Sequence, residues 1–299
     1  RHSACPGCGI FSNLNLFLSG IDGHVVLLFN TGCGMVVTTG FPYTSFKVPY
    51  FHNLFHNGAS TAGGVVEMYQ RFRRQGKIRD EITFVVVSGD GGDDIGMDQV
   101  IGAALRSDPF IMVEYDNKGY MNTGGQLCYT GFLGQRFSNA NVGPGQKGKR
   151  THHKDIIEIL RGTHAPYLFQ ASEYNYRDMI LKARKAQQTV REGGFAFGRL
   201  FSVCPLNWGA EPDQGRRIAE RAVKSCLFPL YEVHHGITKL NYNPEKARQK
   251  LPVTEAFAIM GKVFAHLAAP EFAETAAQIQ SEVDRRWARL LEMDANPKL

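Results

Sequence analysis

The sequence predicts an α/β fold built on a mostly parallel β-sheet with helices on both faces. Short apolar runs alternate with amphipathic segments along the chain, which is typical of strands joined by crossover helices. Two of the apolar runs end abruptly in polar loops, in Gly-Asp-Gly (89–91) and in Asp-Asn (116–117). No internal repeat interrupts the alternation, so we expect a single domain over residues 1–299, with a helical extension from about residue 250.

Periodicity predicts the elements in chain order. The first half holds a helix (11–21), a strand (24–29), a long aromatic loop (38–58), a helix (59–73) and the two strands that end in polar loops. The second half holds a glycine-rich connection (126–153), alternating segments (155–161, 167–171 and 176–190), a last central strand (195–203), a helix (216–226) and a hairpin (228–242) that turns at His235-Gly236. Two amphipathic helices (253–267 and 273–291) follow, and we expect them to lie against other subunits.

The two polar loops predict a binding site, because open α/β sheets bind ligands at the edge where the carboxyl ends of the strands meet. Gly89 and Gly91 let backbone N–H groups approach a diphosphate, while the Asp90 carboxylate suits a hard cation. Asn117 follows Asp90 by 27 positions, which one helix and one strand span. Side-chain oxygens of Asp90 and Asn117 and the Gly119 carbonyl would supply protein ligands to Mg²⁺. An ordinary turn aspartate is the alternative for Gly-Asp-Gly alone.

The loop at 38–58 is aromatic, contains two prolines and shows no periodicity, and such long loops are usually functional. Its His52 and His56 invite a catalytic role, but we favour packing and hydrogen bonding within a buried loop. The helix over 59–73 begins with small residues, as expected where a helix presses on a cofactor or a strand.

Composition excludes several classes of protein. With 43% hydrophobic and 21% charged residues, the 299-residue chain has the makeup of a globular protein with a sizeable core. The net charge of +6 would suit nucleic acid, but apart from a cluster at 146–154 the basic residues are spread along the chain, and an anionic cofactor and substrate would account for the charge. No apolar run approaches the length of a membrane span, and no signal-peptide pattern is visible after Arg1. We therefore expect a cytoplasmic protein that binds neither nucleic acid nor membrane.

The six cysteines indicate metal or redox chemistry, because disulfides are rare in cytoplasmic proteins. Cys5 and Cys8 form a C-x-x-C pair near the N-terminus. Cys33 and Cys204 each follow a predicted strand, and the Gly and Pro residues beside them would let the backbone wrap closely around a cluster. Four thiolates would also hold a structural zinc ion, although zinc sites usually present two close cysteine pairs and this chain has one.

Gly-Asp-Gly followed after one βα unit by Asn resembles the thiamine diphosphate motif of thiamine-dependent enzymes. The continuation Tyr-Met-Asn-Thr-Gly (120–124) is similar to the 2-oxoacid:ferredoxin oxidoreductases, in particular to their small catalytic β subunit. The resemblance covers nearly the whole chain and implies the thiamine diphosphate-binding fold. It also implies that the following residues bind the cofactor: Gly89, Asp90, Gly91, Asn117, Gly119, Asn122, Gly32 and Cys33.

The cysteines fit the same resemblance. The family's β subunits open with Cys-Pro-Gly-Cys-Gly, continue with Thr-Gly-Cys after the first strand, and carry a Cys-Pro ahead of a Trp; here these are residues 5–9, 31–33 and 204–208. The resemblance implies one [4Fe–4S] cluster close to the thiazolium, held by Cys5, Cys8, Cys33 and Cys204 in preference to zinc. Cys128 and Cys226 fall outside this pattern, and we interpret them as ordinary core or loop thiols.

The resemblance implies oxidative decarboxylation of a 2-oxo acid, with electrons leaving through the cluster and coenzyme A taking the acyl group. We expect Thr31 and Asn122 to line the reacting centre. This chemistry needs a glutamate on the aminopyrimidine, and no glutamate here stands in a motif that fits. Family members take that glutamate and a substrate-binding arginine from another subunit, so this chain alone should be inactive. The basic residues at 146–150 form either a solvated loop or a contact for coenzyme A or a partner subunit.

Departures from the family pattern bear on the substrate. After Asn122-Thr123-Gly124 this chain continues Gly-Gln-Leu-Cys, Phe46 stands where Trp is usual, and Cys-Pro is followed by Leu-Asn-Trp. Together with the 20 phenylalanines, these changes favour an aryl 2-oxo acid such as phenylglyoxylate beside pyruvate, with oxalate as a further alternative. The acceptor, a ferredoxin-like protein or NAD, stays open. Two rival classes are a cluster-free thiamine diphosphate decarboxylase or synthase, and a structural iron–sulfur or zinc subunit.

Overall fold

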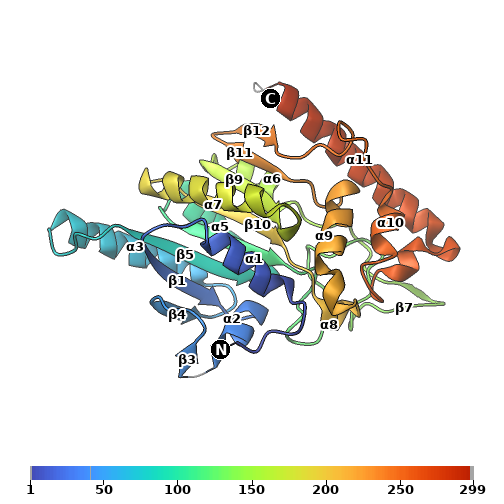
Figure 1. Cartoon of the computed structure of the whole chain (residues 1–299), viewed down its shortest axis with the longest axis horizontal. Helices are drawn as coiled ribbons and strands as arrows, with labels where there is room; N and C mark the ends of the chain where they lie inside the picture. The colour runs from blue at the N-terminus through green and yellow to red at the C-terminus, as the bar shows by residue number, and fades with distance from the viewer. Residues whose placement is uncertain (1, 41, 297–299) are drawn as a thin grey trace.

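The computed structural model describes residues 2–40 and 42–296. In this part of the chain the main sheet has eight strands, in the order β12-β11-β9-β10-β6-β5-β1-β4 (Figure 1). All pair in parallel except β11, which is antiparallel to β9 and to its hairpin partner β12. The bounds are β1 His24–Asn30, β4 Tyr50–Asn53, β5 Ile82–Gly89, β6 Ile111–Asp116, β9 Tyr167–Ser172, β10 Ala196–Phe201, β11 Tyr231–His234 and β12 Ile237–Leu240. The predicted mostly parallel α/β sheet is confirmed.

The helices connect these strands as the sequence alternation predicted. Their bounds are α1 Gly9–Leu18, α2 Cys33–Thr38, α3 Gly58–Arg74, α4 Asp90–Asp94, α5 Met97–Arg106, α6 Ile156–Arg161, α7 Tyr176–Arg191, α8 Pro205–Trp208, α9 Gly215–Lys224, α10 Val253–Phe257 and α11 Ala273–Ala295. Two small ribbons, β2 Thr39–Gly40 with β3 Tyr43–Thr44 and β7 Val142–Gly143 with β8 Gln146–Lys147, lie outside the main sheet. None of the described helices is both long and apolar enough to cross a membrane.

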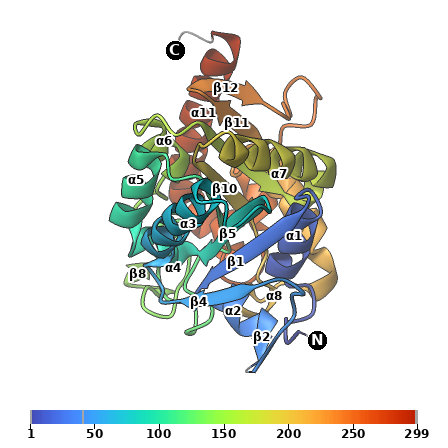
Figure 2. The ribbon, with the colours of Figure 1, turned by 90° about the vertical axis from the view of Figure 1, so that its left-hand side faces the viewer.

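Helices cover both faces of the sheet. In Figure 2, α1 and α7 lie on one side of the strands, and α3, α5 and α6 lie on the other. Val85 and Val87 of β5 enter the core beneath α1 and α7, whereas Val86 between them enters the core beneath α3 and α5. A central strand buried on both faces needs apolar side chains in both directions, which explains why β5 is a continuous apolar run in the sequence.

Two segments differ from the sequence prediction. The region 38–58 is not all loop, because Tyr50–Asn53 forms β4, which pairs in parallel with β1 at the edge of the sheet. The single helix expected over 253–267 is wrong. The helix α10 stops at Phe257, and the chain turns at Gly261, whose φ of 106° favours glycine. A β-carbon at Gly261 would lie 2.4 Å from the Trp208 carbonyl oxygen, so the close approach of two backbones breaks the helix here.

The C-terminal region packs on the rest of the chain (Figure 1). The hairpin turn predicted at His235-Gly236 is confirmed: φ values of 48° and 82° match the type I′ turn that suits two-residue hairpins. The apolar stripe of α11, which includes Ile279, Val283 and Trp287, is buried in the same core as α10. Since this stripe is already covered, the contacts expected between α11 and other subunits concern its charged face.

The parallel strands bring their carboxyl ends to one edge of the sheet. There β1 leads into residues 31–33, β5 into Asp90, β6 into Asn117 and β10 into the segment that carries Cys204. Each of these segments was singled out from the sequence for its chemistry. The topology therefore assembles the candidate site.

Candidate active site

A cavity of about 230 Å³ opens at this edge, among the segments that follow β1, β5 and β6. The residues that the sequence predicted to bind the cofactor or to line the reacting centre all line this cavity: Thr31, Gly32, Cys33, Gly89, Asp90, Gly91, Asn117, Gly119 and Asn122. The remaining lining residues are mostly large and apolar: Phe55, Ile95, Tyr115, Tyr120, Met121 and Thr123. An apolar cavity with a few convergent polar groups is the usual form of a cofactor site.

Tyr115 forms a wall of this cavity, and three glycines pack against its buried ring. A β-carbon at Gly32, Gly34 or Gly89 would lie 2.6 Å from a Tyr115 atom. The Gly34 N–H donates to the Tyr115 hydroxyl over 2.9 Å. These positions therefore require glycine because they pack on a tyrosine. This is a second reason for glycine, beside the close approach to a phosphate that the sequence analysis proposed. Gly91 is different, since a β-carbon there would meet nothing closer than 3.8 Å and would occupy ligand space.

Three oxygen-bearing groups converge at one side of the cavity. A terminal atom of the Asn117 amide lies 2.8 Å from both the Gly119 carbonyl oxygen and Asp90 Oδ2. With its NH₂ turned that way, the Asn117 amide donates to both oxygens; with its oxygen turned that way, three acceptors would meet, and a cation would be needed to hold them together. The Thr130 hydroxyl donates to the other Asp90 oxygen, Oδ1, and so leaves Oδ2 toward Asn117. Carboxylate, amide and carbonyl oxygens are the donor set of a hard cation such as Mg²⁺.

The charges around Asp90 fit the same group. Carboxylate oxygens of Asp90, Glu114 and Asp116 lie within 4.8 Å of one another, and all three side chains are buried. Burial, followed by the charges of Asp116 and Glu114, raises the pKa of Asp90 well above its ordinary value. Burial also opposes ionisation of Asp116, but Arg199 and Lys118 outweigh it and lower that pKa to about 2. A dication beside Asp90 would offset the remaining buried negative charge.

A second group of buried contacts joins the loops around the cavity. Lys154 Nζ lies 3.1 Å from Asp93 Oδ2 and also pairs with Asp94. Asp94 Oδ2 accepts hydrogen bonds from the Tyr120 hydroxyl and the Tyr129 N–H, each over 2.9 Å. Burial opposes the charge on Lys154, but the facing carboxylates prevail and raise its pKa. These contacts fix α4, the loop after β6 and the 126–153 connection relative to one another.

Thr31 and Asn122 are accessible from outside the chain, since Asn122 is exposed and Thr31 is half-buried. The Thr31 hydroxyl lies 2.8 Å from His52 Nε2 and donates to the Asn53 carbonyl over 3.0 Å. The expectation that His52 packs in a buried loop is wrong, because β4 is an edge strand and the His52 side chain is exposed. Its contact with a residue of the cavity makes His52 part of the candidate site.

The predicted cluster ligands lie near enough to one another to affect each other's ionisation, although no three of these thiols have sulfur atoms within 4.8 Å of one another. Burial is the main cause that raises the pKa of the Cys8, Cys33 and Cys204 thiols, and the nearby cysteines add to it. Cys33, which faces both Cys204 and Cys8, has its pKa raised to about 12. The charge of Cys5 likewise raises the pKa of Cys8 and of Cys204. Of the four, Cys33 also lines the cavity, so the thiol group and the cavity are adjacent.

A close contact between two loops explains how the N-terminal turn reaches Cys204. The Gly9 N–H donates to the Val203 carbonyl over 2.9 Å. A β-carbon at Gly9 would lie 2.5 Å from the Val203 nitrogen, so only glycine permits this approach. The two remaining cysteines are buried, in agreement with their interpretation as core thiols. Cys128 contacts the Thr130 hydroxyl over 3.1 Å, and Cys226 lies beneath α11.

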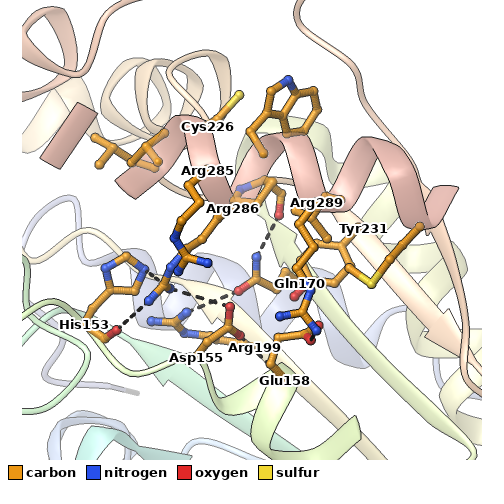
Figure 3. A pocket seen from close by; sticks show the side chains of 16 residues that line it. His153, Asp155, Glu158, Gln170, Arg199, Cys226, Tyr231, Arg285, Arg286 and Arg289 are labelled. Atoms are coloured by element: carbon orange, nitrogen blue, oxygen red, sulfur yellow. Dashed lines mark hydrogen bonds and ion pairs between the residues drawn. The ribbon is translucent and has the colours of Figure 1, made fainter. Parts of the chain in front are cut away.

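A second cavity, of about 150 Å³, lies between α11 and the sheet (Figure 3). Its arginines face carboxylates of the same chain: Arg285 and Arg286 pair with Glu282, and Arg289 pairs with Glu158. At its floor, the buried Arg199 donates to Gln170 Oε1 over 3.2 Å (Figure 3). Since these charges are matched internally, the candidate active site remains the cavity at the carboxyl edge.

Comparison with known proteins agrees with this geometry. Residues 30–197, more than half of the chain, match the family described as thiamine pyrophosphate enzyme, C-terminal TPP binding domain. Pyruvate synthase subunit PorB of Thermotoga maritima is 35% identical over 300 residues, which cover 98% of this chain and 90% of PorB. Ketoisovalerate oxidoreductase subunit VorB of Pyrococcus furiosus is 30% identical over 293 residues, with 98% and 91% covered.

The chain belongs to the β subunits of the 2-oxoacid:ferredoxin oxidoreductase family. This β subunit is therefore one chain of a multi-subunit enzyme that acts on a 2-oxo acid. Its fold is similar to that of 2-oxoglutarate:ferredoxin oxidoreductase from Magnetococcus marinus, with a TM-score of 0.56 and 23% identity over 69% of this chain and 65% of the solved one. The resemblance stated from the motifs is confirmed at the level of the family and of the fold.

Several residues that shape the site of the β subunit escaped the sequence analysis. Tyr115 lies two positions before Asn117, and its role shows only through the three glycines that it contacts. Thr130 lies in a connection without periodicity, so nothing in the sequence links it to Asp90. Lys118 is inside the second polar loop, but the sequence does not indicate which way its side chain points.

Proposed function

We propose that the β subunit binds thiamine diphosphate in the edge cavity, with Mg²⁺ held by Asp90, Asn117 and the Gly119 carbonyl. The observation that carries the proposal is that the Asn117 amide lies 2.8 Å from both the Gly119 carbonyl oxygen and Asp90 Oδ2, so that its oxygen, if turned toward them, would complete the donor set of a cation. The open face of Gly91 leaves room for a diphosphate beside them. When bound, the cofactor supplies a carbon nucleophile for the ketone of a 2-oxo acid. The chain's part is to bind the diphosphate through the metal and to orient the cofactor against Tyr115 and Met121.

The same proposal includes one [4Fe–4S] cluster held by Cys5, Cys8, Cys33 and Cys204. Its support is that the structure brings these thiols together from three separate segments. Because the Cys33 thiol has a pKa of about 12, it stays protonated without metal, and cluster binding must displace that proton. Asn207 Nδ2 lies 3.8 Å from Cys204 Sγ, and hydrogen bonds of this kind tune the potential of a cluster. A cluster at Cys33 would adjoin the cavity, which suits electron transfer from it.

The proposed overall reaction converts a 2-oxo acid anion and the thiol of coenzyme A into an acyl thioester, CO₂, one proton and two electrons. The electrons pass to a ferredoxin-like acceptor. Thr31 and Asn122 would hydrogen-bond the reacting groups from the cavity mouth, and His52 would orient the Thr31 hydroxyl. The solved 2-oxoglutarate:ferredoxin oxidoreductase has coenzyme A bound, and we propose the same co-substrate here. Of the basic residues at 146–150, the exposed Lys147 and Arg150 are a candidate contact for its phosphates or for a partner subunit, whereas Lys149 is buried and donates to backbone carbonyls of its own chain.

Another subunit would complete the site. Among the described residues that line the cavity there is neither a glutamate nor an arginine, although the aminopyrimidine needs a carboxyl group and the substrate carboxylate needs a cation. Phe55 and Ile95 at the cavity are 42% and 57% exposed, and Leu54 beside them is 61% exposed. Apolar side chains gathered around a functional cavity are typical of an interface. We therefore propose that the partner covers this rim and supplies both missing groups.

The substrate proposal has four members. Pyruvate is first, because PorB relatives are subunits of pyruvate synthases, and VorB adds ketoisovalerate as a branched analogue. Phenylglyoxylate follows from the aromatic and apolar lining at Phe55, Tyr120 and Met121. Oxalate is the further alternative. A cluster-free thiamine diphosphate decarboxylase or synthase is the rival activity. A cytoplasmic location and a single domain with a C-terminal helical extension complete the proposal.

One anaerobic experiment tests this function. The purified chain is assayed for reduction of a viologen dye with each 2-oxo acid and coenzyme A, first alone and then mixed with its partner subunits. We expect no turnover by the chain alone and substrate-dependent reduction by the mixture, with iron, sulfide and thiamine diphosphate present. Robust turnover by the isolated chain would contradict the split site. Decarboxylation without iron or dye reduction would favour the cluster-free rival.

A further inference from the structure

Lys118 lies between two of the groups proposed to bind the metal, and its buried ammonium pairs with Asp116. Its φ of 62° is in the left-handed region, which lysine seldom adopts. Its side chain is only 1% exposed, and Nζ lies 2.6 Å from Asp116 Oδ2. A lysine in a diphosphate-binding loop is expected to reach a phosphate. The side chain of Lys118 is instead buried in the protein interior.

Three aromatic rings surround the buried ammonium group of Lys118. Nζ lies 4.6 Å from the ring centre of Phe132 and 5.8 Å from those of Phe201 and Phe228. Asp116 Oδ2 also forms an ion pair with Arg199, whose NH2 is 2.6 Å away. In so apolar a site, the attraction between Asp116 and its two cations is strong, and loss of one partner is costly. The backbone that carries these groups is therefore held firmly.

Hydrogen bonds on the same side fix the loop from residue 116 to residue 119. Asp116 Oδ1 accepts from the Lys118 N–H over 3.1 Å. The indole of Trp208 donates to the Asn117 carbonyl over 2.9 Å, and Gln135 Nε2 donates to the Lys118 carbonyl over 2.7 Å. Two successive carbonyls are thus occupied by donors behind the loop. The third, at Gly119, accepts from the Met121 N–H over 2.8 Å and also faces the Asn117 amide.

We propose that Lys118 is a positioning residue for the metal: its ion pair with Asp116 holds the loop that presents the Asn117 amide and the Gly119 carbonyl. The proposal rests on the metal ligands of the proposed function. A purely structural ion pair would stabilise the fold without affecting metal affinity. The two roles are therefore separated by measuring affinity and stability on the same variants.

The test compares Lys118→Met with a matched control, Lys182→Met. Lys182 is also 1% exposed; its Nζ lies 2.7 Å from Asp178 Oδ2 and donates to the Gln170 carbonyl, but it belongs to α7. Methionine keeps the length of lysine and suits an aromatic surrounding. Calorimetric titration of the full chain with thiamine diphosphate over a series of Mg²⁺ concentrations gives the affinities, and urea unfolding gives the stabilities.

We expect both variants to lose stability and only Lys118→Met to lose metal-dependent binding, by about 10- to 100-fold, as for other residues that orient metal ligands. Equal affinities for wild type and Lys118→Met would overturn this inference and leave the proposed metal site standing. A wild-type chain that takes up neither Mg²⁺ nor thiamine diphosphate would overturn the proposed site and the inference with it. If Lys118→Met does not fold, Gln135→Met decides, since it loosens the same loop by removing the donor to the Lys118 carbonyl, together with the acceptor of the Phe132 N–H. Unchanged affinity there would also contradict the inference.

Discussion

Thr130 gives a sharp test of the proposed metal site, because it contacts the proposed metal ligand Asp90 but is not itself a proposed ligand. Its side chain is buried, and its hydroxyl donates to Asp90 Oδ1. Thr130→Val keeps the shape of the side chain and removes that hydrogen bond. Asp90 itself is unchanged in this variant, but it loses the hydrogen bond that turns Oδ2 toward Asn117.

The size of the effect follows from the charge on Asp90. A buried hydrogen bond to a charged group contributes about 1.5–3 kcal/mol. Burial raises the pKa of Asp90, so without metal the charged form of this carboxyl is disfavoured, and a hydrogen bond to the neutral form is worth less. Most of the loss therefore falls on the metal-bound form, in which Asp90 is ionised. With about 1.4 kcal/mol per tenfold, Mg²⁺-dependent binding should weaken about 10- to 150-fold.

The assay is calorimetric titration with thiamine diphosphate and Mg²⁺, and Thr189→Val is the control. Thr189 is a buried threonine of α7 whose hydroxyl donates to the Lys185 carbonyl over 2.9 Å, away from the cavity. We expect Thr189→Val to bind as wild type does. Wild-type affinity in Thr130→Val would refute the argument that this hydroxyl orients a metal ligand.

Three further predictions concern the cysteines and Lys154. Cys33→Ser and Cys204→Ser should lose iron and visible absorbance, because hydroxyls do not replace thiolate ligands, while Cys128→Ser and Cys226→Ser keep both; iron loss in Cys128→Ser alone would overturn the ligand set. Burial raises the pKa of Cys226 to about 12, so alkylation should accelerate about tenfold per pH unit up to that value and stay slow near neutrality, as mass spectrometry can follow. Lys154→Met should lower the free energy of urea unfolding by about 3–5 kcal/mol by leaving Asp93 and Asp94 unpaired. Without Lys154 the pKa of Asp93 rises above its wild-type value of about 6, so that loss should shrink as the pH falls toward 6, because a protonated Asp93 needs no partner; a loss independent of pH would contradict this assignment.

Sequence patterns located the site because its chemistry lies at strand ends. Gly89-Asp90-Gly91 and Asn117 follow buried strands, and parallel strands bring such positions to one edge whatever the details of packing. Cys33 and Cys204 were located by the same logic. These features depend on local sequence and on a topology that the βα alternation already implies.

The supporting residues depend on contacts that local sequence does not encode. Thr130 reaches Asp90 from a connection with no period, and the orientation of Lys118 is decided by Phe132 and Asp116. The broken helix after Phe257 has a similar origin, since Gly261 meets a backbone atom 53 positions earlier in the chain, at Trp208. Periodicity reports which face of a segment is apolar, but it does not report what the opposite surface requires.

The most direct test is a titration of the full chain with thiamine diphosphate, with and without Mg²⁺, in wild type and Asp90→Ala. An amide and a carbonyl alone do not compete with water for Mg²⁺, so Asp90→Ala should bind no cofactor while its circular dichroism spectrum stays unchanged. Wild type should bind one thiamine diphosphate per chain, and only with the metal present. Stoichiometric binding by Asp90→Ala, or binding by wild type that does not require Mg²⁺, would contradict the account.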